Sequence, residues 1–78
     1  MEFKEWLSNK KKYSSRSTQD IFSRLKRVKN ILNIDTIDTK TEEKLQKSKK
    51  FLELSCSVKS QMRIAVRTYI EYKGENHD

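Results

Sequence analysis

The sequence predicts an all-α protein, a small bundle of four or five helices, from three observations. The chain of 78 residues has no proline and one glycine, whereas folds built from strands and tight turns need more turn residues. Its apolar residues recur at helical spacing in several stretches. A chain of this length forms one domain around a small core. We therefore expect a single helical domain over residues 1–74 and a disordered tail over residues 75–78.

The first half of the chain contains two amphipathic segments. Within residues 2–11, Phe3, Trp6 and Leu7 lie on one face of a predicted helix. Ser17 and Asp20 have the spacing of a capping box, so we expect the Ser17 side chain to cap a second helix over residues 18–32. That helix has a basic outer face and an apolar stripe formed by Ile21, Leu25, Val28 and Leu32.

The second half predicts a loop, one or two short helices, and a long final helix. Residues 33–38 form the loop, with Ile34 and Ile37 expected in the core. From residue 39 or 41 to residue 54 the spacing is helical but slips near Ser48, so this stretch forms either one helix or two. The last helix, about residues 57–73, has a wide apolar face and is expected at the centre of the bundle. Gly74 suits the position just past its end.

The positive charge is unevenly distributed. The net charge is +7, made up of +3 in residues 1–16, +3 in residues 17–32, zero in residues 33–56 and +1 in residues 57–78. A basic surface concentrates polyanions around a protein. Lys10, Lys11 and Lys12 precede a segment rich in serine, in which Arg16, Ser17 and Thr18 open the second helix, and this combination is typical of a phosphate contact.

Lys59, Arg63 and Arg67 follow one another at intervals of four residues on the last helix. Like charges at this spacing repel one another, and Glu71, one turn further on, is expected to balance only Arg67. Contact with phosphates explains such a row, and a solubilising helix face is the alternative. Tyr13, within the basic connection, suits either a nucleic-acid contact or the core.

Catalytic and metal-binding patterns are missing from the sequence. His77, the only histidine, is the second-last residue, so with a single cysteine there is no set of zinc ligands. Glycine-rich phosphate loops and nucleophile motifs are also absent. We therefore expect no enzymatic activity, no cofactor, no metal and no small-molecule substrate. Cys56 excludes an internal disulfide and is expected to be buried or half-buried.

The sequence also predicts a cytoplasmic protein. No stretch approaches the roughly 20 apolar residues that cross a bilayer, so no contact with a membrane is expected. The N-terminus has no apolar signal core.

The order of these features resembles the N-terminal core-binding domain of tyrosine recombinases and phage integrases, a SAM-like helical bundle. The matching pieces are Phe3-x-x-Trp6-Leu7, the serine-rich lead into Ser17-Thr18, and the last helix from Ser60 to Tyr72 with its arginines and terminal aromatics. Together they span about residues 2–73. The recombinase catalytic domain, with its arginines, histidine and tyrosine nucleophile, is missing from this sequence.

The resemblance implies a DNA-binding module from a phage or mobile element. In that family the second and last helices contact the duplex. By position, this implies contacts from Ser17, Thr18, Arg24, Arg27, Lys59, Arg63 and Arg67.

Two functions follow from the sequence. The first is a non-catalytic module that binds double-stranded DNA. The alternative is a protein-interaction module, inhibitor or regulator that docks its basic face on an acidic partner, with Ile64, Ile70 or apolar residues of segment 51–54 as anchors. Neither the oligomeric state nor a preferred DNA site follows from the sequence.

Overall fold

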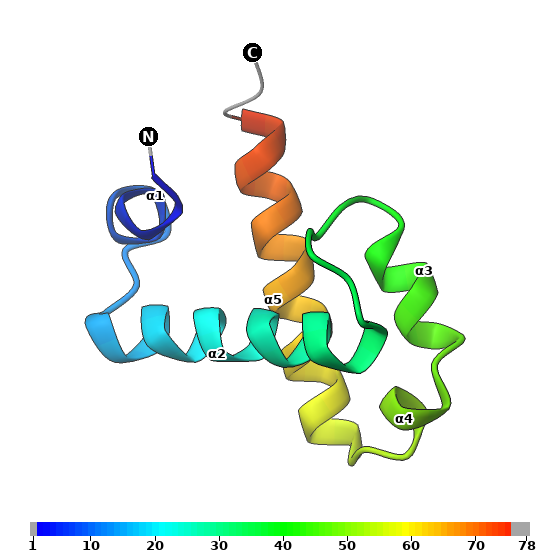
Figure 1. Ribbon diagram of the computed structural model, residues 1–78. Helices are drawn as coiled ribbons and strands as arrows, with labels where there is room; N and C mark the ends of the chain where they lie inside the picture. The colour runs from blue at the N-terminus through cyan, green and yellow to red at the C-terminus, as the bar shows by residue number, and fades with distance from the viewer. Residues whose placement is uncertain (1, 76–78) are drawn as a thin grey trace.

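Two long helices, α2 (Ser15–Leu32) and α5 (Cys56–Glu75), cross one another and form the frame of the protein (Figure 1). The computed structural model describes residues 2–75, and these contain five α-helices and no strand. Helix α1 (Phe3–Asn9) packs against both long helices, and α3 (Thr41–Gln46) also contacts both. The short α4 (Lys49–Leu52) packs against α3. The predicted all-helical bundle is confirmed.

One small core joins all five helices and the loop between α2 and α3. Its largest fully buried side chains are Trp6, Leu7, Leu45, Phe51 and Met62. Ile37 brings the loop into this core with 6% of its surface exposed, as its place in the sequence predicts. At one end, the Phe3 ring lies 5.0 Å from both Tyr69 and Tyr72 between ring centres, so aromatic contacts fasten α1 to α5.

Helix α2 begins three residues earlier than the sequence predicts. Ser14, in an extended conformation, is the N-cap, and its side-chain oxygen accepts the Ser17 backbone N–H at 3.2 Å. The expectation that Ser17 caps α2 is therefore wrong. Both serines are good caps, and Ser15 and Arg16 continue the helix backwards to the first of them. The helix ends at Leu32, and its C-cap Asn33 adopts the left-handed conformation with φ 54°.

The stretch after the loop forms two helices, which confirms one of the two predicted alternatives. Ser48 separates α3 from α4 because its backbone is extended, with ψ 120°. Its side chain accepts the Phe51 backbone N–H at 3.4 Å and so caps α4.

Helix α5 is longer than predicted at both ends. Ser55 accepts the Val58 backbone N–H at 3.3 Å, and the helix begins at Cys56, whose side chain is exposed rather than buried or half-buried. Gly74 lies inside the last turn without a positive φ, so the prediction that it follows the helix is wrong. Glu75 is also helical and does not belong to a tail. The rest of the predicted tail, with His77, lies outside the described residues.

Candidate nucleic-acid interface

An exposed isoleucine lies at the centre of the surface that contains several predicted binding residues. Ile64 on α5 is 51% exposed. It lines two shallow hollows, which therefore adjoin. One, of about 270 Å³, lies between α2 and α5 and is lined by Tyr13, Ser17, Asp20, Ile21, Arg24 and Ile64. The other, of about 280 Å³, runs along α5 and is lined by Ser60, Arg63, Ile64 and Arg67.

We name this surface the Ile64 face and define it by Ser17, Arg24, Ser60, Arg63, Ile64 and Arg67. It combines predicted residues from two helices that are about 40 positions apart in the chain. Asp20 contributes one carboxylate to its α2 edge. Folding thus gathers three arginines around one apolar side chain.

Arg67 is exposed but has an acidic partner. Its Nε donates to Glu42 Oε1 at 2.9 Å, and a terminal guanidinium nitrogen lies 2.6 Å from the same oxygen. This hydrogen bond, with the attraction between the charges, raises the pKa of Arg67. The sequence-based expectation that Glu71 balances Arg67 is wrong, because α3 brings Glu42 to it instead.

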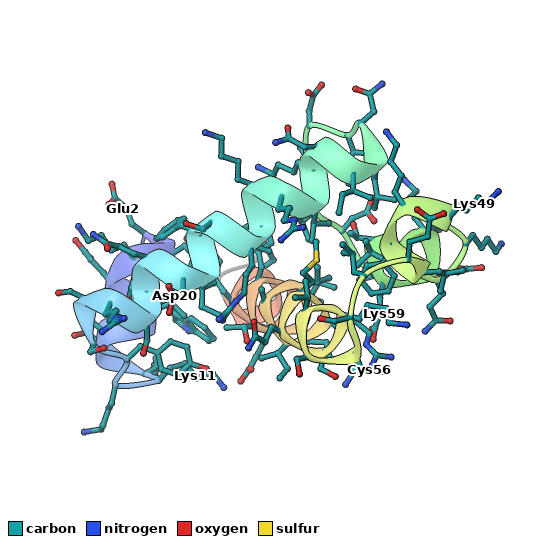
Figure 2. The ribbon with its side chains drawn as sticks, turned by 90° about the horizontal axis from the view of Figure 1, so that it is seen from below. Glu2, Lys11, Asp20, Lys49, Cys56 and Lys59 are labelled. Atoms are coloured by element: carbon teal, nitrogen blue, oxygen red, sulfur yellow. The ribbon has the colours of Figure 1, made fainter. Side chains whose placement is uncertain are left out.

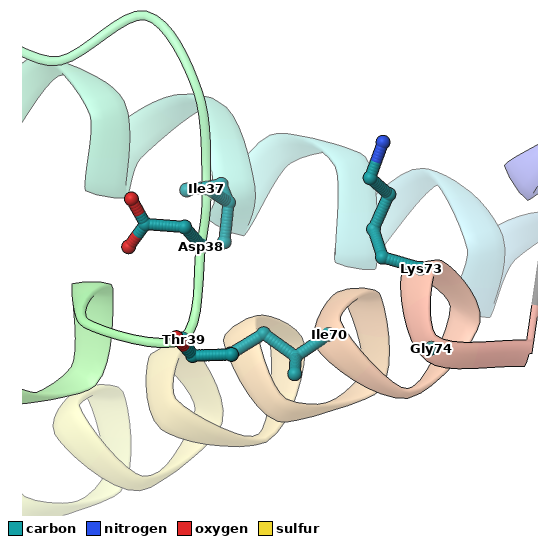
Figure 3. A pocket seen from close by; sticks show the side chains of 6 residues that line it. All are labelled: Ile37, Asp38, Thr39, Ile70, Lys73 and Gly74. Atoms are coloured by element: carbon teal, nitrogen blue, oxygen red, sulfur yellow. The ribbon is translucent and has the colours of Figure 1, made fainter. Parts of the chain in front are cut away.

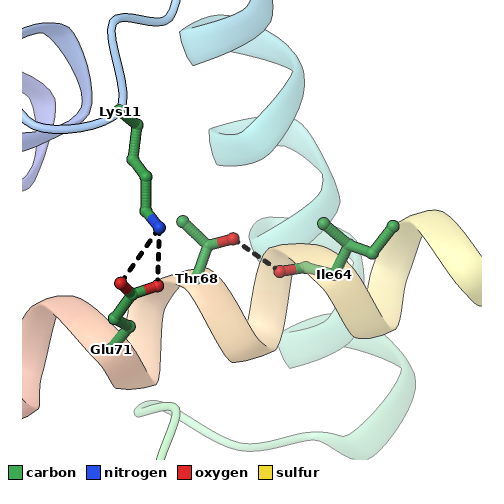
Figure 4. Close-up of polar contacts among 4 residues, drawn as sticks. All are labelled: Lys11, Ile64, Thr68 and Glu71. Carbon is green, nitrogen blue, oxygen red and sulfur yellow. Dashed lines mark hydrogen bonds and ion pairs between the residues drawn. The ribbon is translucent and has the colours of Figure 1, made fainter.

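Glu71 pairs with Lys11, across 60 positions of the chain. Lys11 Nζ lies 2.8 and 3.0 Å from the two carboxylate oxygens (Figure 4). The same nitrogen lies 5.5 Å from the centre of the Trp6 ring, which is within range of a cation–π contact. Lys11 is half-buried and joins the connection after α1 to α5. Its contacts indicate a structural role.

Thr18 lies in the protein interior, with 3% of its surface exposed. Its hydroxyl oxygen has no hydrogen-bond partner within the part of the chain that the structure describes. Ser17, one position earlier, is exposed because it lies on the outer side of the same turn. The candidate interface therefore keeps Ser17 and loses Thr18, because Thr18 lies three residues before Ile21 on the buried face of α2.

The other predicted cations are solvent-accessible but do not form one patch. Figure 2 shows Lys11 and Lys59 in separate places, with Lys11 in the connection after α1 and Lys59 near the start of α5. Lys59 is half-buried near the start of α5. Four more are exposed on α2 or in the connection between α1 and α2: Lys10, Lys12, Arg16 and Arg27. Of the eleven predicted residues, four line the hollows around Ile64, namely Ser17, Arg24, Arg63 and Arg67.

Tyr13 lies against the core, which is one of its two predicted alternatives, and its nucleic-acid contact stays a prediction. It is half-buried and packs against the core, and it also lines the hollow that holds Arg24 and Ile64.

The described residues show neither a metal site nor a membrane span. Within residues 2–75 no three histidine, cysteine or acidic side chains group as metal ligands do. No helix in that range is both long and apolar enough to cross a bilayer. Asp38, just before α3, has a local structural role instead. Asp38 accepts the Lys40 backbone N–H at 2.9 Å, and this hydrogen bond is the largest cause of a lowered pKa for Asp38.

No family model, curated protein or solved structure matches the chain. The resemblance to recombinase core-binding domains remains a prediction.

Sequence reasoning identified most of the Ile64 face but missed two of its features. The first is Glu42, because its pairing with Arg67 depends on how α3 packs against α5. Ser60 carries no charge and attracts attention only through its place beside Arg63. Ile64 itself was detectable, because it falls outside the apolar stripe of its helix.

Proposed function

We propose that this protein is a non-catalytic module that binds double-stranded DNA through the Ile64 face. The observation that supports this most directly is the grouping of Arg24, Arg63 and Arg67 from two separate helices around one exposed residue. Arginine binds phosphate well because its planar guanidinium offers paired donors in a fixed geometry. The hydroxyls of Ser17 and Ser60 add short donors that suit phosphate oxygens.

The ion pair between Arg67 and Glu42 is compatible with this function. The Arg67 side chain is 64% exposed, and exposed ion pairs contribute only about 0–1 kcal/mol to stability. Exchanging Glu42 for a phosphate therefore costs little. In the protein without bound DNA, the ion pair with Glu42 holds the Arg67 side chain in place and offsets its repulsion from Arg63.

Most of the affinity comes from the backbone of DNA rather than its bases. A net charge of +7 attracts the duplex, and neutralised phosphates release their counterions. Base readout, where it occurs, falls to arginines of this face.

Two double variants test the face with equal changes of charge. Arg63→Ala/Arg67→Ala removes two cations from the Ile64 face. Lys26→Ala/Lys29→Ala removes two from the other flank of α2, because Lys26 is about 200° around the helix from Arg24. Fluorescence anisotropy of a labelled random duplex should show about tenfold weaker binding for the arginine variant and less than about threefold for the lysine variant. Equal losses would remove the Ile64 face from the proposal.

A second candidate function is docking on an acidic protein, which the exposure of Ile64 favours. An apolar side chain ringed by arginines suits the centre of a protein interface. In that case the duplex does not bind even at low salt. In that case Ile64→Asp abolishes binding of the protein partner, and neither the wild type nor the variant binds DNA.

A further inference from the structure

A separate apolar groove lies on the opposite flank of α2 from Arg24. Its first part is a hollow of about 500 Å³ between α1, α2 and α5. Phe3, Phe22, Ile37 and Tyr69 are among its lining side chains. Phe22 is 43% exposed, and its ring meets the Phe3 ring edge-on with 5.4 Å between centres. A large aromatic side chain is thus held in position and left uncovered.

The groove continues towards the end of α5. A second hollow of about 390 Å³ is lined by Ile37, Thr39, Ile70 and Gly74, among others (Figure 3). Ile37 lines both hollows, so they adjoin. At Gly74 a Cβ would meet nothing within 4 Å, so the groove is open at this end. The groove consists of two adjoining, open hollows rather than one enclosed cavity. This form suits a segment of polypeptide chain better than a compact small molecule.

The charges that border the groove are mainly positive. Lys26 and Lys29 line the first hollow and Lys73 the second. Asp38 is the one acidic residue among the lining side chains. Its carboxylate accepts from the Lys40 backbone and points away from Ile70 (Figure 3). An occupant with apolar and acidic groups therefore complements the groove.

We propose that this groove binds an acidic amphipathic helix of a protein partner. Such a helix presents apolar side chains at spacings of three and four residues, which would follow the row from Phe22 to Ile70. Its glutamates or aspartates would meet Lys26, Lys29 and Lys73. The proposal is independent of DNA binding, because none of these residues lines the hollows of the Ile64 face.

A designed peptide tests the groove directly. The probe is a labelled helix of about 16 residues, roughly four turns, with leucines along one face and glutamates elsewhere. Fluorescence anisotropy with the full chain should show binding, weakened about tenfold by Phe22→Ala and by Lys26→Glu/Lys29→Glu. Arg63→Glu/Arg67→Glu makes the same change of charge on the Ile64 face and should weaken binding less than about threefold. Circular dichroism establishes that each variant is folded. If Phe22→Ala unfolds, Lys26→Glu/Lys29→Glu still tests whether the peptide binds in the groove.

Several outcomes overturn the proposal. The first is an absence of peptide binding to the folded wild-type protein. A peptide with lysines in place of the glutamates that binds equally well removes the role of charge. If Lys26→Glu/Lys29→Glu and Arg63→Glu/Arg67→Glu weaken peptide binding equally, the peptide responds to the net charge of the protein and not to the lysines of the groove. Binding of decanoate at Phe22 and Ile37 in NMR spectra, without binding of the peptide, assigns the groove to a small anion instead.

Discussion

Arg67 on α5 and Glu42 on α3 form an ion pair at 2.6 Å in the face that we propose to bind DNA. Glu42 therefore competes with phosphate for Arg67. Replacing Glu42 by glutamine frees the arginine, and we expect DNA affinity to rise about two- to threefold, the range that an exposed pair of up to about 1 kcal/mol allows. Anisotropy titrations of Glu42→Gln against the wild type measure the change.

The matched control is Glu43→Gln. Glu43 is the next residue and pairs at 3.4 Å with Lys47, just past the end of α3, so this variant makes the same change of net charge without releasing Arg67. We expect a smaller gain from it. If both variants raise the affinity equally, net charge alone explains the effect and Arg67 has no special place in binding.

Lys11 is expected to stabilise the fold rather than to contact DNA. Lys11→Ala loses the ion pair with Glu71 and the contact with the Trp6 ring, each worth up to about 1 kcal/mol at a partly exposed site. Thermal unfolding should show a midpoint lower by about 4–8 °C per kcal/mol lost. Lys10→Ala, an exposed neighbour, serves as the control. A midpoint unchanged by Lys11→Ala contradicts the structural role.

Thr18→Val tests whether Thr18 belongs to the interior. The substitution keeps the shape of the side chain and removes a buried hydroxyl that has no partner within residues 2–75. We expect the free energy of unfolding to rise by about 1 kcal/mol, measured by urea denaturation, because an unsatisfied buried hydroxyl costs about 1–3 kcal/mol. DNA affinity should stay the same. A loss of affinity with stability unchanged would place Thr18 back at the interface.

The sequence predicted the helices well because their apolar faces are local patterns. The Ile21–Leu25–Val28 stripe and the break at Ser48 each depend on residues within a few turns. Helix ends were harder, because Ser14 and Ser17 are equally suitable caps and only the extent of the helix chooses between them. The pairs Arg67–Glu42 and Lys11–Glu71 join segments 25 and 60 positions apart. No local pattern contains that information.

The binding surfaces show the same division. Charge and spacing identified Arg63 and Arg67, and the serine-rich basic segment indicated Ser17. Arg24, which comes from α2, was implied by the family resemblance. The lysine-bordered groove was not predicted at all. Phe22 adjoins Ile21 in the sequence, and only the packing of α1, α2 and the loop leaves it uncovered.

Asp38 makes the fold sensitive to acid. Its pKa lies below the ordinary value of 3.8, mainly because its carboxylate accepts the Lys40 backbone N–H. A pKa lowered by folding stabilises the folded state above the unfolded value, and this contribution is lost as the pH falls through the folded value. Between about pH 5 and pH 2, the unfolding temperature of Asp38→Asn should therefore fall less than that of the wild type. Parallel curves would contradict this role for Asp38.

The most direct test of DNA binding is the salt dependence of affinity for a labelled random duplex. We predict that the logarithm of the binding constant falls linearly with the logarithm of salt concentration for the wild-type protein. The slope should be shallower by about 2 in Arg63→Ala/Arg67→Ala, since each phosphate contact contributes about 0.9. Lys26→Ala/Lys29→Ala should keep the wild-type slope. No binding at low salt, or one slope shared by all three proteins, would contradict the proposal that the Ile64 face holds the phosphates.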